Sequence, residues 1–175
     1  DQAKRLTPPV VVLRPFSKAY GLAGIRIGYG VMPPNVADYL NRVRQPFNTT
    51  AVSQAAALAA LDDDEFLDRT RQTTWDGLSY LYGELDRLRL PYVPTQTNFV
   101  LIEVPFEARR IYEATLRRGV IIRSMASYGL LHHIRINVGL PEENRRFVTA
   151  LEEVLAELTD SGPHADSTAA TVRQS

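Results

Sequence analysis

Residues 10–30 restrict the possible folds of this chain most strongly, because two short apolar runs flank a loop that contains a lysine. The first run, residues 10–13, is continuous and rich in β-branched side chains, which is typical of a strand covered on both faces in a parallel sheet. The second run, residues 25–30, also predicts a buried strand, in which Arg26 is the exception that needs a partner. A proline and two glycines break regular structure between the runs. We therefore expect two buried strands joined by a loop that carries Lys18.

Composition excludes several classes of protein. Of the 175 residues, 45% are apolar and 23% are charged, which is too apolar for a disordered chain. The 20 basic and 20 acidic side chains balance, so charge gives no reason to expect nucleic acid or an anionic membrane as a partner. No apolar run approaches the roughly 20 residues of a membrane-spanning helix. The chain has no cysteine, which excludes disulfides, thiolate zinc sites and cysteine nucleophiles and fits a reducing compartment.

The rest of the chain predicts helices first and an alternation of strands and helices afterwards. The acidic run 62–64 offers an N-cap and favourable charge to a long helix with apolar residues every three or four positions, and such a helix often bridges two lobes. Gly119 is expected to end one helix and Pro141 to begin another. The expected helices are Pro33–Pro34 to Val43, 51–61, 65–89, 106–118 and Pro141 onward, and the expected strands are 97–104, 120–123 and 134–138.

Three residues in and just after the first loop carry the chemical information. A lysine that is removed from solvent near other cations, as Lys18 is expected to be, loses its preference for the ammonium form, so its neutral amine can attack a carbonyl. Arg26 in an apolar strand is costly unless it meets an anion, and its planar fork suits a phosphate, to which the hydroxyl of Ser17 can also bond. A carbonyl-reactive lysine beside a Ser/Arg pair is what pyridoxal phosphate requires, although a solvated lysine and an ion-paired arginine fit the same spacing.

Residues 16–29, Phe-Ser-Lys-Ala-Tyr-Gly-Leu-Ala-Gly-Ile-Arg-Ile-Gly-Tyr, closely resemble the lysine motif of fold-type I aminotransferases, and most of all that of the histidinol-phosphate aminotransferases. The resemblance continues in order and at the family's spacing over nearly everything between residues 10 and 158. The other similar segments are 43–48, 54–61, 96–99 and 134–144.

This resemblance implies an α/β fold, namely the pyridoxal-phosphate-dependent transferase fold of aspartate aminotransferase. The chain is expected to hold the C-terminal part of the large domain and an α+β small domain. The implied division is 1–64 for the portion of the large cofactor-binding domain, 65–90 for a long inter-domain helix, 91–159 for the small domain and 160–175 for a disordered tail.

The resemblance also implies a role for each of five residues. Lys18 matches the lysine that forms a Schiff base with pyridoxal phosphate and then acts as general base. Ser17 and Arg26 match ligands of the cofactor phosphate. Arg135 matches the arginine that receives the substrate α-carboxylate. Arg123 matches the position that contacts the phosphate or carboxylate end of the substrate in the histidinol-phosphate group, although a surface arginine at a strand end would look the same.

Two features depart from the family pattern. Pro15 stands where relatives typically carry a threonine or serine that helps to hold the phosphate, and proline offers neither a hydroxyl nor an N–H. The family's residues that stack on the cofactor ring, contact its O3′ and keep its pyridine nitrogen protonated all precede the lysine motif, and they have no counterpart here. The chain also begins with Asp1 rather than methionine. We therefore expect the C-terminal half of an aminotransferase, which by itself transaminates slowly or not at all.

The implied activity is amino transfer between glutamate and imidazole-acetol phosphate, which yields histidinol phosphate in histidine biosynthesis. The resemblance implies a cytoplasmic homodimer with small amino-acid and keto-acid substrates. An aromatic amino acid aminotransferase and the threonine-phosphate decarboxylase of cobalamin synthesis are alternatives, because Arg123 and Arg135 do not by themselves distinguish a phosphate from a carboxylate. A truncated, non-catalytic fragment is the alternative from another class. No metal site is expected, because the adjacent His132 and His133 point in divergent directions.

Overall fold

The chain divides into two compact units, with the boundary between Gln72 and Thr73. The computed structural model describes residues 10–160. This boundary lies inside helix α3 (Asp64–Arg87). The ends of α3 lie within two residues of the ends predicted for the long helix, 65 and 89. The assignment of the two units to the large and small domains of an aminotransferase stays a prediction.

Both ends of the expected division fall partly outside the described residues. These are residues 1–9 of the expected large-domain portion and the expected disordered tail from residue 161 onward. Asp160, taken as the first residue of that tail, is instead the last residue of helix α5 (Pro141–Asp160).

The first unit contains a two-stranded sheet, which differs from the expectation of buried parallel strands. Strands β1 (Val12–Pro15) and β2 (Gly28–Val31) pair antiparallel, with Leu13 opposite Gly30. All residues of both strands are exposed, including Leu13 at 70% and Val31 at 61%. The prediction of burial and of parallel pairing was therefore wrong for the described residues. The apolar composition is real, but burial requires neighbouring layers, and within the described chain these strands pair only with each other.

Two helices of the first unit begin and end where the sequence predicts. Helix α1 (Pro34–Val43) carries a proline at its first position, and helix α2 (Ala51–Leu61) is capped by Thr50, whose Oγ1 accepts the N–H of Ser53 at 3.0 Å. The apolar stripe of α1 is not covered, since Leu40 and Val43 are exposed. A short 3-10 turn, η1 (Ala23–Ile25), lies between the two strands.

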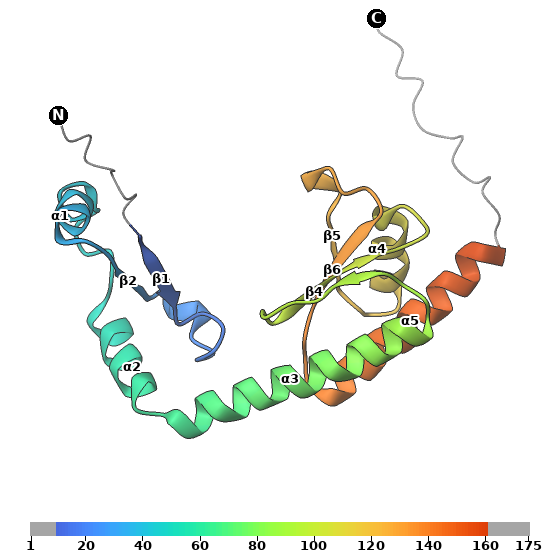
Figure 1. The fold of residues 1–175 in the computed structure, drawn as a ribbon, viewed down its shortest axis with the longest axis horizontal. Helices are drawn as coiled ribbons and strands as arrows, with labels where there is room; N and C mark the ends of the chain where they lie inside the picture. The colour runs from blue at the N-terminus through green and yellow to red at the C-terminus, as the bar shows by residue number, and fades with distance from the viewer. Residues whose placement is uncertain (1–9, 161–175) are drawn as a thin grey trace, which may run out of the picture. The chain divides into compact units, whose positions relative to one another are not determined.

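The second unit is built on a four-stranded antiparallel sheet in the order β3-β4-β6-β5. Figure 1 labels three of these strands, β4, β6 and β5. Its strands are β3 (Tyr92–Val93), β4 (Phe99–Glu103), β5 (Arg123–Ser124) and β6 (His133–Asn137). Strand β3 was not predicted, because two residues are too short to show a periodicity. The strand expected at 120–123 is confirmed only at its last residue.

One face of this sheet is buried under helices, so its residues alternate between inside and outside. Val100 and Ile102 of β4 and Ile134 and Ile136 of β6 are buried, while the residues between them are partly exposed. The covering side chains come from α3, α4 (Ala108–Arg117) and α5, and the fully buried ones include Leu81, Leu85, Ile111, Leu151 and Val154. Burial of each large aliphatic side chain contributes about 2 kcal/mol. The second unit therefore has a hydrophobic core made of its own residues.

Helix α5 is fastened to its two neighbours by ion pairs. Arg118, just after α4, bonds Glu153 at 3.0 Å and Glu157 at 2.6 Å, and Arg87 of α3 bonds Glu152 at 2.9 Å. The hydrogen bond from Arg118 lowers the pKa of Glu157, and that from Arg87 lowers the pKa of Glu152. Within residues 10–160, no helix combines the length and the apolar composition needed to cross a membrane.

Candidate functional site

The loop that carries Ser17 and Lys18 is closed by backbone hydrogen bonds at its base. Phe16 N–H donates to the Ile27 carbonyl at 3.2 Å, and Leu22 N–H donates back to the Phe16 carbonyl at 3.0 Å. Phe16 is 3% exposed, and its ring lies 4.9 Å from that of Tyr20 between centroids. A buried aromatic anchor therefore holds residues 16–27 as one closed segment.

Lys18 begins a tight turn inside this loop. Its carbonyl accepts the N–H of Gly21 at 3.0 Å, and Gly21 has a φ of 67°, which favours glycine. Lys18 is exposed and Ser17 is half-buried. The expectation that Lys18 is removed from solvent was therefore wrong for the described chain, because no described side chain covers the loop on that side.

Arg26 lies outside the strand to which it was assigned. It follows η1 in the left-handed conformation, with a φ of 53°, and it is exposed. Its Nη1 donates to the Ala23 carbonyl at 2.8 Å. The apolar pattern at 25–30 concealed this turn, since a strand and a turn of isoleucines and glycines read alike. Ser17, Lys18 and Arg26 nevertheless belong to the same closed loop.

Ser53 contacts this loop, and sequence analysis did not identify it as a site residue. It is 4% exposed, and its Oγ donates to the Ile25 carbonyl at 2.8 Å. The bond ties the start of α2 to the peptide just before Arg26. The Thr-x-x-Ser cap was visible in the sequence, but the partner 28 residues away was not.

Arg123 and Arg135 lie directly opposite each other on neighbouring strands. They are partners in the antiparallel register of β5 and β6, so both side chains belong to the same face of the sheet, the one not covered by helices. Like charges in such a pair are destabilising. Within residues 10–160, neither guanidinium forms an ion pair with a carboxylate. The pair therefore favours an anion from outside the described chain.

The surroundings of Arg135 support this conclusion. Its guanidinium lies 4.9 Å from the centre of the Phe99 ring, which supports it from one side. Its Nε is buried and has no hydrogen-bond partner among the described residues. An unsatisfied buried donor on a cation is costly, and an oxyanion would satisfy it.

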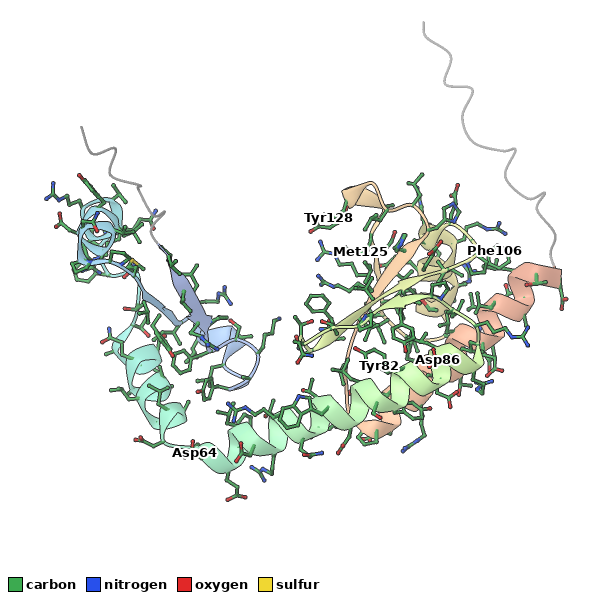
Figure 2. All side chains as sticks on the ribbon, in the orientation of Figure 1. Asp64, Tyr82, Asp86, Phe106, Met125 and Tyr128 are labelled. Carbon is green, nitrogen blue, oxygen red and sulfur yellow. The ribbon has the colours of Figure 1, made fainter. Side chains whose placement is uncertain are left out.

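Arg123 is held by an aromatic residue from the following turn. Tyr128 lies in η2 (Ala126–Tyr128; Figure 2). Its hydroxyl accepts from Nη2 of Arg123 at 3.1 Å, and its ring lies 5.5 Å from the guanidinium. No sequence pattern singles out Tyr128 among the eight tyrosines. Its place depends on the turn that ends at Gly129, with a φ of 80°.

A surface cavity of about 620 Å³ lies beside the arginine pair. Arg123, Arg135 and Arg146 line it, together with one acidic residue, Glu143. The carboxylate of Glu143 already accepts the N–H of Leu140 at 2.7 Å. The cavity therefore carries an excess of positive charge.

The five predicted site residues fall into two groups. Ser17, Lys18 and Arg26 share one loop of the first unit, and Arg123 and Arg135 share one strand pair of the second. His132 and His133 stand at the start of β6, and within residues 10–160 no three metal-ligating side chains gather into a site.

Most of the chain is similar in sequence to known proteins. The family model of aminotransferase class I and II matches residues 3–151. The chain is 49% identical to a histidinol-phosphate aminotransferase of Bdellovibrio bacteriovorus and 51% identical to one of Symbiobacterium thermophilum, each over 150 residues that make up 86% of this chain. These matches cover 40% and 42% of the relatives, so the chain spans about two fifths of their length.

Solved structures give the same result. The histidinol-phosphate aminotransferase of Sinorhizobium meliloti, determined in complex with pyridoxal-5'-phosphate, is similar with a TM-score of 0.70 and 30% identity, over 85% of this chain and 42% of that one. The L-threonine-O-3-phosphate decarboxylase of Porphyromonas gingivalis is similar with a TM-score of 0.67 and 26% identity, over 83% and 46%. The fold is thus the aspartate-aminotransferase-like α/β fold that the resemblance implied. With a family match over most of its residues, the chain belongs to the aminotransferase class I and II family.

Proposed function

We propose that this chain supplies part of a pyridoxal-phosphate-dependent aminotransferase that moves an amino group between glutamate and imidazole-acetol phosphate. The observation that carries the proposal is the pair Arg123 and Arg135, which face the same side of the sheet without a carboxylate partner among residues 10–160. Two adjacent guanidinium groups suit a substrate with a phosphate or with two carboxylates. Imidazole-acetol phosphate and glutamate meet this requirement.

The donor set of the first loop fits pyridoxal phosphate. A half-buried hydroxyl (Ser17) and a guanidinium (Arg26) are suited to a phosphate, and Lys18 supplies a primary amine, the group that reacts with a carbonyl. Among residues 10–160, Nη1 of Arg26 donates to the Ala23 carbonyl, and Nη2 and Nε remain as donors toward an anion. When bound, pyridoxal phosphate supplies an aldehyde that reacts with amines and a ring that withdraws electrons.

Each residue then has one role. The hydroxyl of Ser17 and the guanidinium of Arg26 would hold the phosphate of the cofactor, and Lys18 would hold its aldehyde end. Nζ of Lys18 would take the proton from the α-carbon of the substrate and deliver it to the cofactor. Arg135 binds the α-carboxylate of the substrate, with Phe99 supporting the guanidinium. Arg123, held by Tyr128, binds the other anionic end. Pro15 offers no hydroxyl, so Ser17 and Arg26 carry more of the phosphate binding.

Threonine-phosphate decarboxylation is a second candidate. It is favoured by the similarity to the Porphyromonas gingivalis decarboxylase, and its substrate also carries a carboxylate and a phosphate. An aromatic aminotransferase is less consistent with the arginine pair, since aromatic amino acids have no second anion. Whether the chain is active by itself, or is a non-catalytic part, is settled by assay. We further propose a cytoplasmic homodimer, and light scattering on the purified chain tests the dimer.

The test uses an unusual property of the sequence, which contains only two lysines, Lys4 and Lys18. The chain is mixed with pyridoxal phosphate, and its visible spectrum is recorded before reduction with borohydride and mapping of the modified residue by mass spectrometry. We expect a visible absorption band and a label on Lys18. The band should persist in Lys4→Ala and disappear in Lys18→Ala. A label confined to Lys4 would refute the assignment.

The substrate is tested by amino transfer from glutamate to imidazole-acetol phosphate and to phenylpyruvate, and by release of carbon dioxide from threonine phosphate. These assays use the chain itself and a version extended to the length of its relatives. Preference for imidazole-acetol phosphate supports the first candidate. Preference for phenylpyruvate in both proteins rules it out.

A further inference from the structure

Among the described residues of the first unit, Ser53 is the one polar side chain that is buried. It lies in the first turn of α2, and its hydroxyl donates to the carbonyl of Ile25, 28 residues earlier. Buried hydroxyls form hydrogen bonds because an unsatisfied one is costly, but this partner is not a neighbour in the helix. The bond therefore serves the loop rather than α2 alone.

Counting protons shows that Ser53 belongs to a relay, that is, a chain of hydrogen bonds that runs from Thr50 through Ser53 to the Ile25 carbonyl. A serine hydroxyl has one proton, which here goes to the Ile25 carbonyl at 2.8 Å. The contact of 2.9 Å between Ser53 Oγ and Thr50 Oγ1 must then use the proton of Thr50. Thr50 Oγ1 in turn accepts the N–H of Ser53 at 3.0 Å. Hydrogen bonds joined in this way strengthen one another.

The relay ends at the peptide that sets the direction of Arg26. Arg26 has a φ of 53°, a conformation that residues with a side chain rarely adopt and that persists only when its surroundings hold it. Ser53 holds the carbonyl that precedes Arg26, and the Ala23 carbonyl holds Nη1 of its guanidinium. One hydrogen bond thus holds the backbone next to Arg26, and the other holds its guanidinium.

We infer that Ser53 is a positioning residue: its hydroxyl fixes the Ile25–Arg26 peptide and thereby directs the Arg26 guanidinium toward the cofactor phosphate. This inference rests on the proposed function for the phosphate and on the hydrogen bonds above for the positioning. Ser53 acts through Arg26 and does not itself touch the cofactor.

The positioning is tested by trypsin, which cleaves after arginine. Ser53→Ala should speed cleavage after Arg26 by about tenfold, the effect expected for loss of one buried hydrogen bond, because the loop opens more often. Cleavage after Arg42 in α1 should change by less than about twofold. Ser53→Thr, which keeps the hydroxyl, should restore the slow rate. The matched control is Thr49→Ala, which removes a nearby hydroxyl that accepts from the exposed Gln54 amide.

The link to the phosphate is tested by comparing the affinities for pyridoxal phosphate and for pyridoxal, which has no phosphate. In the unaltered chain the dissociation constant for pyridoxal, divided by that for pyridoxal phosphate, should be greater than one. Ser53→Ala should reduce that ratio by about tenfold by weakening only the binding of pyridoxal phosphate. In an Arg26→Ala background the same substitution should leave the ratio unchanged.

The outcomes separate the two proposals. Faster cleavage after both Arg26 and Arg42, or no change at either, overturns the positioning by Ser53 whatever the cofactor result. Selective cleavage with an unchanged ratio overturns its link to the phosphate. An unaltered chain that does not prefer pyridoxal phosphate refutes the phosphate role of Arg26 and with it the inference, while the trypsin result still reports on the relay.

Discussion

The two units of this chain contain similar fractions of apolar residues but bury them to different extents. In the second unit, the antiparallel sheet is covered by α3, α4 and α5, and side chains such as Leu81 and Ile102 have no exposed surface. In the first unit, Leu13 and Val52 are more than two-thirds exposed, at 70% and 74%, and Phe47 is 98% exposed. The contrast shows that an apolar pattern predicts a tendency to be buried, whereas actual burial depends on which elements supply the opposite surface.

The chemical groups follow the same division. The candidate residues Ser17, Lys18 and Arg26 lie in the first unit, on a loop closed by backbone hydrogen bonds, and the arginine pair lies in the second unit, on a sheet packed against a buried core. The following predictions test how large the difference between the two units is.

The largest difference should appear in amide hydrogen exchange. Amides of β4 and β6 are released only when the core opens, whereas a two-stranded sheet with exposed faces opens readily, so protection should differ by at least about a thousandfold between β4 and β1. Exchange followed by mass spectrometry or NMR measures it. Equal protection in the two sheets would show that the first unit has a core of its own.

Removal of a core side chain should affect only the second unit strongly. Leu81→Ala should lower the free energy of unfolding by about 3 kcal/mol, because it leaves a cavity at a fully buried position. The control Leu58→Ala, at a residue that is 67% exposed in α2, should change it by less than about 0.5 kcal/mol. Urea unfolding followed by circular dichroism gives both values. A comparable loss in both variants would contradict the contrast.

Two glycines of α3 offer a finer test. A Cβ at the buried Gly77 would collide with Cγ1 of Val138, so Gly77→Ala should destabilise by about 2 kcal/mol. A Cβ at Gly83 would meet nothing within 4 Å, so Gly83→Ala should stabilise by about 0.5–1 kcal/mol through helix propensity. Thermal unfolding of both variants measures the sign. A stabilised Gly77→Ala would mean that α3 packs less closely on the segment after β6.

The smallest effect should be a dependence on pH that belongs to the second unit. Hydrogen bonds from Arg87 and Arg118 lower the pKa of Glu152 and Glu157 below the usual value of 4.5. A carboxyl whose pKa is lower in the folded state stabilises above its unfolded value and loses this contribution as pH falls through the folded one. Unfolding should therefore become easier below about pH 4.5. Arg118→Met should flatten the part of this dependence that comes from Glu157, and an unchanged profile would show that the ion pairs of Arg118 contribute nothing.

Much of the local structure was predictable. The limits of α2, the proline start of α1 and the cap of α3, where Asp63 Oδ1 accepts the N–H of Phe66, follow from propensity and capping rules that act within a few residues. The five candidate site residues were also named in advance, through resemblance to a family. Tyr128, Phe99 and Ser53 were not, because their roles arise from partners that local sequence does not specify.

By itself, the sequence determined the helices, the family and the chemical types of the candidate site, because these depend on side-chain chemistry and on contacts between near neighbours along the chain. Tertiary structure alone decided that β1 and β2 are antiparallel and exposed, that Arg26 sits in a turn, and that Arg123 stands opposite Arg135. Each of these depends on strand pairing and register between distant segments, and a register is set by packing that no single segment contains.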